Sequence, residues 1–366
     1  MTPKTARTSQ SIDLVRRLML VASLSYLLSG TPLCAQETQE KIDVDGLART
    51  FIVHLPQGYD PQKHYPVVVM LHGENQDADD MSRLTHFSQF AEKNGVIAVY
   101  PDAARGKWNI GVRPEAEPEM ARSPYGRRRG YPGGGYPGGG YPGGSQNPGG
   151  DRGNQNPDEN KNRPEPADDV AFLNQMLDQI ALKYAVDTHR IYAAGLGDGG
   201  FMALRAGCTM ADRIAAVAAV SAELPKTMIC LPQRPIGAVF IEGTDDPIAP
   251  YQGGMYKTER FRLLSAEESS KTWAKFDRCS EKPAQGKLAA PQKGGKETKT
   301  LTFSDCHENA QVMLYTIRDG GHTWPGGEQY SSEKEVGKVS YSLNANETVW
   351  GFLSTKRIAA ESGAQK

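Results

Sequence analysis

A segment at residues 190–200 has the pattern of a strand that turns sharply into a helix, and it carries a glycine where chemistry needs a nucleophile. The β-branched and small residues of 190–196 predict the strand, and the glycines after it predict the turn. In the nucleophile elbow, Gly-x-Ser-x-Gly, such a strained turn presents a serine hydroxyl. Here the spacing is Gly195-x-Gly197-x-Gly199, so the hydroxyl is missing. The functional interpretation depends on this difference.

Two later segments could supply an acid and a base, in the chain order nucleophile, acid, histidine. Residues 241–247 follow a predicted buried strand, so their carboxylates lie at its carboxyl end, where open α/β sheets gather their sites. Asp245 and Asp246 are both candidates for the acid, and Asp246, directly before Pro247, is preferred. His322 lies in a glycine-rich loop after the last predicted strand. A carboxylate beside an imidazole fixes its tautomer and stabilises its protonated form.

Backbone N–H groups near the elbow could form an oxyanion hole. The loop after the first central strand supplies one donor in this arrangement, and the residue after the nucleophile position supplies the other. We therefore expect donors from Gly73 or Glu74 and from Asp198. The side chain of His72 is expected to pack the strand end. Asp198 is a poor substitute nucleophile because its side chain should point away from the hole, and a water activated by the acid and the histidine is another alternative.

The remaining pattern predicts one α/β domain with a mainly parallel central sheet and helices on both faces. Apolar runs that alternate with helical patterns indicate such a sheet. We expect a helix through 81–91 and another through 170–181, capped by Asp168 or Asp169. The expected strands are 50–55, 67–71, 96–100, 190–196, 215–220, 236–241 and 312–317.

Composition divides the chain into four parts. Residues 1–35 are expected to be an export signal, because two arginines precede an apolar run that is too short to span a bilayer. A retained N-terminal anchor is the alternative, and Leu33 disfavours lipid attachment at Cys34. Residues 112–167, with three Tyr-Pro-Gly-Gly copies and few aliphatic residues, are expected to be disordered. The domain would comprise 36–111 and 168–357, followed by a flexible tail at 358–366.

Charge and cysteine content exclude several functional classes. The 42 Lys and Arg balance 43 Asp and Glu, which gives no case for nucleic-acid or membrane binding after signal cleavage. The chain has five cysteines, and cleavage after Ala35 would leave four. An even number of cysteines in an exported chain favours disulfides. Three pairings are possible, and we prefer the one that closes two short loops. It joins Cys208 to Cys230 and Cys279 to Cys306. No metal site is predicted, since the cysteines are far apart and no histidines fall at ligand spacing.

Several motifs together resemble the secreted poly(3-hydroxybutyrate) depolymerase and feruloyl-esterase-like branch of the α/β hydrolases. They occur in order over about residues 42–355, with the predicted disordered segment left out. They include Asp45-Gly46, Leu55-Pro56, Leu71-His72-Gly73, Tyr100-Pro101-Asp102, Trp108-Asn109, Asp168-Asp169-Val170, Gly195-Leu196, Gly243-Thr244, Asp246-Pro247 and Gly321-His322-Thr323-Trp324-Pro325-Gly326. The resemblance implies an α/β-hydrolase fold, carboxylic-ester substrates and a triad whose acid and base are Asp246 and His322. The family has Gly-Leu-Ser-Asn-Gly where this chain has Gly-Leu-Gly-Asp-Gly.

Three hypotheses follow for the function. The preferred one is a secreted or periplasmic, catalytically impaired protein that binds an ester, a polyester or a plant-polymer-like ligand, with Trp108 and Trp324 near the pocket and no cofactor. The second is an active esterase that uses a non-standard nucleophile or an activated water. The third is a surface or matrix protein that acts through its Tyr-Pro-Gly segment.

Overall fold

A computed structural model describes residues 37–112, 166–259, 261–289 and 296–359. The predicted signal, residues 360–366 of the predicted tail and nearly all of the predicted disordered segment at 112–167 lie outside the described residues. Ile358, the first residue of the predicted tail, donates its N–H to His189 O at 3.0 Å. The described residues contain these elements, in chain order: β1 (Glu37–Val44), β2 (Leu47–His54), β3 (Tyr65–Leu71), α2 (Ala78–Thr85), α3 (Phe87–Asn94), β4 (Ile97–Pro101), η2 (Ala104–Gly106), α4 (Asp169–Lys183), β5 (Val186–Leu196), α5 (Asp198–Thr209), β6 (Ala216–Val220), β7 (Gly237–Gly243), β8 (Gly254–Met255), β9 (Arg262–Leu263), α6 (Ala266–Phe276), β10 (Ala284–Leu288), β11 (Thr298–Phe303), η4 (His307–Asn309), β12 (Val312–Ile317), α7 (Glu333–Val336) and α8 (Ala345–Leu353).

One large sheet runs through the described residues, in the order β1-β2-β4-β3-β5-β6-β7-β12-β11-β10. The pairs from β4 to β12 are parallel, and the outer strands on both sides pair antiparallel. The predicted mainly parallel sheet is therefore confirmed. The sequence reasoning missed the edge strands β1 and β10, the strand β11 between β10 and β12, and the two short strands β8 and β9. Because β3, β5 and β7 are parallel, their carboxyl ends open onto one edge, and the candidate site lies there.

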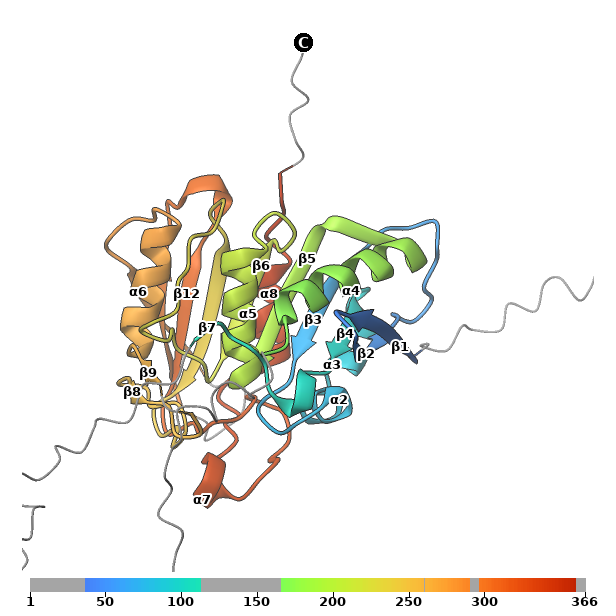
Figure 1. Cartoon of the computed structure of the whole chain (residues 1–366). Helices are drawn as coiled ribbons and strands as arrows, with labels where there is room; N and C mark the ends of the chain where they lie inside the picture. The colour runs from blue at the N-terminus through green and yellow to red at the C-terminus, as the bar shows by residue number, and fades with distance from the viewer. Residues whose placement is uncertain (1–36, 113–165, 260, 290–295, 360–366) are drawn as a thin grey trace, which may run out of the picture.

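The sheet is covered on both faces, as its doubly buried strands require. Successive residues of β3 alternate between two cores: Val67 and Val69 belong to one, and Val68 and Met70 belong to the other. Helices α4, α5 and α6 pack on the first face, and α2, α3 and α8 pack on the second. Figure 1 shows α4, α5 and α6 in front of the sheet and α8 behind it.

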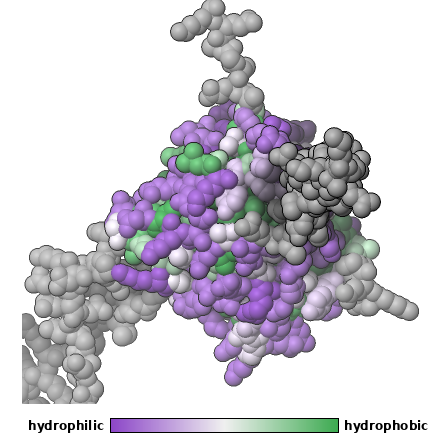
Figure 2. Space-filling view, turned by 90° about the vertical axis from the view of Figure 1, so that its right-hand side faces the viewer, coloured by the Kyte–Doolittle hydropathy of each residue, from purple (hydrophilic) through white to green (hydrophobic). Residues whose placement is uncertain are grey.

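Two disulfides close short loops, and they have the preferred pairing. Cys208, near the end of α5, bonds Cys230, and Cys279, just beyond α6, bonds Cys306. The sequence-based pairing is confirmed. Figure 2 shows a face on which hydrophobic residues form small separate patches among hydrophilic ones. Among the helices of the described residues, none has the length and apolar character that a bilayer crossing requires.

Candidate active site

The turn between β5 and α5 keeps the backbone geometry of a nucleophile elbow although it carries no nucleophile. Gly197 has φ 53° and ψ −115°, a conformation that residues with a Cβ rarely adopt. Its N–H donates to Val220 O at 2.9 Å, and its carbonyl accepts from Phe201 N–H at 3.0 Å. The turn is thus held by β6 on one side and by the first turn of α5 on the other.

The glycines on either side of the turn are there because backbones approach closely. A Cβ on Gly195 would overlap the Gly199 backbone, and a Cβ on Gly199 would overlap the Leu71 backbone. A Cβ on Gly197 would meet a side chain instead, since it would lie 2.5 Å from His322 Nε2 and 3.1 Å from His322 Cε1. Position 197 therefore points at the imidazole, as a nucleophile in a triad would.

The acid and the base predicted from the sequence lie in contact. His322 Nδ1 lies 2.9 Å from Asp246 Oδ2, and the two residues are 5% and 8% exposed. The other carboxylate oxygen, Asp246 Oδ1, accepts the N–H groups of Ile248 and Ala249, both at 2.8 Å. Asp245 is exposed and bonds Thr244 instead. Of the two candidate acids, Asp246 is the one that the structure brings to the imidazole.

The main chain of the His322 loop is anchored independently of the side chain. His322 N–H donates to Val336 O at 2.6 Å, and Tyr330 Oη donates to His322 O at 3.0 Å. Tyr256 also lies near, with its ring centroid 6.5 Å from that of the imidazole. Burial raises the pKa of the Tyr256 phenol well above its usual value, so this group stays neutral. With Nδ1–H donated to Asp246, the lone pair of His322 lies on Nε2 and faces Gly197.

The structure narrows the choice of oxyanion-hole donors. Gly73 N–H donates to Gln76 Oε1 at 2.9 Å, so it is already used. Glu74 N–H has no acceptor among the described residues, and Asp198 N–H begins helix α5, where a first-turn N–H has no intrahelical partner. The Glu74 side chain turns toward Lys107, whose Nζ lies 3.8 Å from Oε1. Glu74 N–H and Asp198 N–H are the donors that remain.

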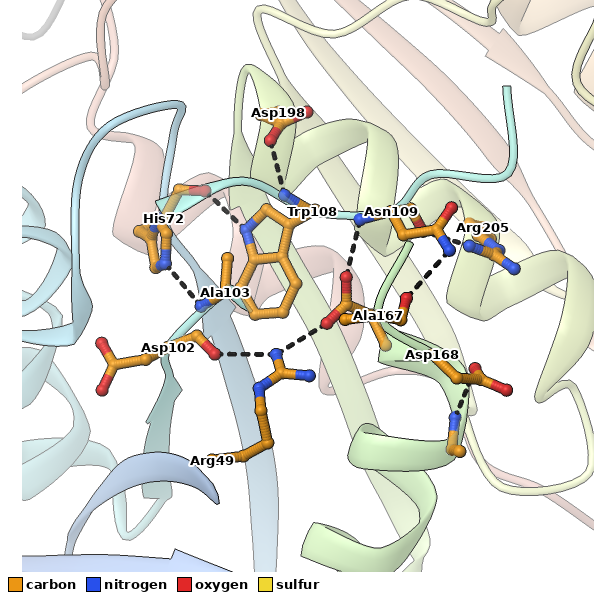
Figure 3. A network of polar contacts seen from close by, with 12 residues as sticks. Arg49, His72, Asp102, Ala103, Trp108, Asn109, Ala167, Asp168, Asp198 and Arg205 are labelled. Atoms are coloured by element: carbon orange, nitrogen blue, oxygen red, sulfur yellow. Dashed lines mark hydrogen bonds and ion pairs between the residues drawn. The ribbon is translucent and has the colours of Figure 1, made fainter. Parts of the chain in front are cut away.

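His72 and Trp108 hold the loops of the site together and are themselves buried. His72 Nδ1 bonds Gly73 O at 2.7 Å, and His72 Nε2 accepts Ala103 N–H at 2.9 Å (Figure 3). Burial lowers the pKa of His72, which agrees with a neutral ring that donates at Nδ1 and accepts at Nε2. Trp108 Nε1 donates to His72 O at 2.9 Å. The structural role expected for His72 is thus matched by its contacts.

The two tryptophans expected near the pocket do not present their rings to a ligand. Trp108 is 2% exposed and Trp324 is 0% exposed. Their indole N–H groups are bonded inside the protein, Trp108 to His72 O and Trp324 to Asn346 Oδ1 at 2.9 Å. Both indole rings therefore pack inside the described structure, and the substrate-binding role expected for Trp108 and Trp324 stays a prediction.

Asp198 contributes a buried carboxyl beside the elbow that sequence reasoning did not treat as an ionisable group. Its Oδ2 accepts Trp108 N–H at 2.9 Å, and its Oδ1 has no hydrogen-bond partner among the described residues (Figure 3). Burial is the largest cause that raises the pKa of Asp198 to about 8. At neutral pH the carboxyl is therefore mostly protonated and acts as a neutral hydrogen-bonding group.

Two more buried carboxyls, those of Glu242 and Glu223, lie close to Asp246, and the sequence reasoning did not single them out. Glu242 is in β7 and Glu223 follows β6, and they are 1% and 0% exposed. Glu242 Oε1 accepts Ala222 N–H at 3.2 Å, while neither oxygen of Glu223 has a described partner. Burial is the largest cause that raises both pKa values well above the usual range; Glu242 and then Asp246 add to it for Glu223, and Asp246 adds to it for Glu242. Glu242 stands in an apolar run, which is the signal that could have revealed its burial.

The network in Figure 3 joins the elbow helix to the two ends of the segment at 113–165. Asn109 N–H donates to Asp169 Oδ2 at 2.6 Å, and Asn109 Nδ2 donates to Ala167 O at 2.9 Å. Arg205 of α5 bonds Asn109 O. The chain therefore leaves and re-enters the described structure at one place.

Comparison with known proteins shows which proteins this chain resembles in sequence. No protein-family model matches the chain. The putative esterase NocK of Nocardia uniformis subsp. tsuyamanensis is 24% identical over 336 residues, which cover 87% of this chain and 83% of NocK. Feruloyl esterase B of Piromyces equi is 33% identical over 169 residues, 44% of this chain and 30% of that protein. The probable feruloyl esterase C of Aspergillus niger is 28% identical over 155 residues, 42% of this chain and 50% of that protein.

This chain is a homologue of esterases. The match to NocK extends over most of both proteins, whereas the chain spans half or less of the two feruloyl esterases. The fold of this esterase homologue agrees with that relationship, because its parallel sheet, its elbow and its Asp–His pair follow the order of an α/β hydrolase.

Proposed function

We propose that this esterase homologue binds a carboxylic ester at the Gly197–His322 site and hydrolyses it far more slowly than a serine esterase would. The acid, the base and two backbone donors are retained, but no hydroxyl stands at position 197. In serine proteases, losing a triad member lowers turnover by about a millionfold and leaves about 10³–10⁴ over water from the hole and binding. The same arithmetic applies here if acyl transfer requires the serine.

One observation carries the proposal. The Cβ direction of Gly197 points at His322 Nε2, with the distance of 2.5 Å given above, from a backbone that has kept elbow angles. A loop that merely joined a strand to a helix would have no reason to hold this conformation. We therefore infer a serine-hydrolase site in which the elbow serine is replaced by Gly197 and the asparagine after it by Asp198.

The test compares Gly197→Ser with Gly197→Ala and the wild type on a short-chain aryl ester. Both substitutions add a Cβ at the same strained position, at a cost of about 1–3 kcal/mol of folding free energy, and both require the imidazole to withdraw. A Ser–His hydrogen bond of about 2.6–3.2 Å can then form only in the serine variant. We expect Gly197→Ser to gain turnover that Gly197→Ala does not, and Gly197→Ser/His322→Ala to lose that gain.

Two results would contradict the proposal. Equal turnover in the serine and alanine variants would mean that position 197 does not face the reacting ester. Wild-type turnover that already equals that of Gly197→Ser would mean that the glycine does not impair the site.

The relatives suggest the chemical class of the ligand. The names of two of them, feruloyl esterase B and the probable feruloyl esterase C, suggest feruloyl esters as the ligand class. The motif resemblance to poly(3-hydroxybutyrate) depolymerases makes hydroxyalkanoate polyesters the other candidate. The two disulfides are typical of an oxidising compartment, which supports an exported protein.

A further inference from the structure

His322 Nε2 lies closer to the Cβ position of residue 197 than it would if a serine hydroxyl stood between them. Its Nε2 lies 2.5 Å from the position of a Cβ at residue 197. In a Ser–His pair a hydroxyl oxygen lies between the two, bonded to Cβ and about 2.6–3.2 Å from the nitrogen. In this chain residue 197 has no side chain, and Nε2 lies next to the position from which a serine oxygen would extend.

The hydrogen bonds around the ring leave Nε2 as the nucleophilic atom. Asp246 Oδ2 accepts a hydrogen bond from Nδ1–H at 2.9 Å, so the free lone pair is on Nε2. The other candidate at the elbow, Asp198, is already bonded through Oδ2 to Trp108 N–H and is mostly protonated at neutral pH. A protonated carboxyl is a poor nucleophile, which leaves the imidazole.

We propose that His322 Nε2 attacks aryl esters directly and carries the acyl group as an acyl-imidazole. This inference rests on the proposed function, because it places the ester at the same site. The Nε2 lone pair forms a bond to the carbonyl carbon, and the carbonyl π electrons move to an oxygen that faces Glu74 N–H and Asp198 N–H. Collapse of this adduct breaks the ester C–O bond and releases the aryl oxide. The positive charge on the acylated ring is stabilised by Asp246.

Water completes the reaction without any further reagent. It adds to the acyl carbon, the C–Nε2 bond breaks, and the electron pair returns to the ring. The products are the carboxylic acid, the neutral imidazole and one proton, which the aryl oxide takes to become the phenol. One ester and one water have then given one acid and one phenol.

The substrate must have a good leaving group and a small acyl group. Imidazole, whose conjugate acid has a pKa near 6.5, leaves more readily than an alkoxide, so an adduct from an alkyl ester returns to substrate. A phenoxide, with a parent pKa of about 10 or lower when it is activated, can compete as the leaving group. The 5% exposure of His322 favours small acyl groups such as acetyl or dimethylcarbamoyl.

The probe is p-nitrophenyl N,N-dimethylcarbamate, since a carbamoyl-imidazole hydrolyses slowly enough to isolate. The full mature chain is incubated with it, release of p-nitrophenolate is followed, and the label is mapped by tandem mass spectrometry. We expect one label per chain on His322, and a labelling rate that falls by about tenfold or more in His322→Ala and in Asp246→Asn. His64→Ala, which removes an exposed histidine outside the site, should label at the wild-type rate.

Each other outcome overturns the inference. A label on Asp198, on a lysine or on His64, or a wild-type rate no higher than that of His322→Ala, would show that Nε2 is not the nucleophile. Failure of this acyl-imidazole inference can be distinguished from failure of the proposed function. If Gly197→Ser gains turnover while wild-type His322 stays unlabelled, only the nucleophilic role of His322 is lost. If His322 is labelled while Gly197→Ser and Gly197→Ala have equal ester turnover, the proposed function is contradicted instead.

Discussion

Replacing Asp198 by asparagine should change how folding stability depends on pH. The wild-type carboxyl is 0% exposed, and burial raises its pKa from 3.8 to about 8. Asparagine keeps an oxygen that can accept Trp108 N–H, has nearly the same shape and does not ionise. The comparison therefore isolates the proton on one side chain.

The expected size follows from proton linkage. Between pH 3.8 and about 8 the folded protein holds a proton on Asp198 that the unfolded chain has released. This contribution to stability is fully present below the unfolded pKa and is lost as pH rises toward the folded pKa. The loss is about 1.4 kcal/mol per pH unit, or about 2.7 kcal/mol from pH 5 to pH 7. Asp198→Asn has no such loss, so its stability relative to the wild type should grow by that amount.

Urea unfolding at pH 5, 6, 7 and 8, with the disulfides intact, measures the difference by linear extrapolation. Asp277→Asn is the comparator, because Asp277 is also buried, bonds Ile236 N–H at 2.8 Å and has its pKa raised to about 7 by burial. The Asp277 difference should stop growing near pH 7, whereas the Asp198 difference should grow to about pH 8. A wild-type-minus-Asp198→Asn difference that is equal at pH 5 and pH 7 would refute the buried-proton reasoning.

Two further predictions concern the network of Figure 3. Replacing 113–165 by a short Gly-Ser linker should leave the thermal midpoint and the far-ultraviolet circular dichroism per folded residue nearly unchanged. The reason is that Asn109 already bonds Ala167 and Asp169 across the gap. A molten or insoluble product would show that the segment is needed for the fold. Arg49→Met should cost about 3–5 kcal/mol in urea unfolding, since it leaves the buried Asp169 carboxylate without the ion pair at 2.6 Å, and Arg49→Met/Asp169→Asn should recover part of that loss. A double variant no more stable than Arg49→Met would contradict the second prediction.

The central sheet and the acid–base pair could be predicted because their signals are local. Continuous apolar runs such as 67–71 and 236–241 indicate strands buried on both faces, and their carboxyl ends gather at one edge. The order of the elbow, Asp246 and His322 along the chain then places the pair. The edge strands were missed for the opposite reason. β10, with all five residues exposed, has no apolar periodicity to read.

The features that could not be predicted depend on distances between segments far apart in sequence. Nothing local indicates that Gln76 takes the Gly73 N–H or that Trp324 is wholly enclosed. The raised pKa values of Asp198 and Glu223 arise mainly from burial by other elements, which composition does not reveal. These groups nonetheless set the electrostatics around the dyad.

The three glycines of the elbow differ in how freely each position can change during evolution. A Cβ at Gly195 or Gly199 would overlap neighbouring main chain, whereas a Cβ at Gly197 would meet only the side chain of His322. Among descendants of a common ancestor, the outer two positions should then be invariant while the middle one alternates between glycine and serine. A lineage could lose and regain the serine hydroxyl at position 197 by changing one codon, while Asp246 and His322 are retained.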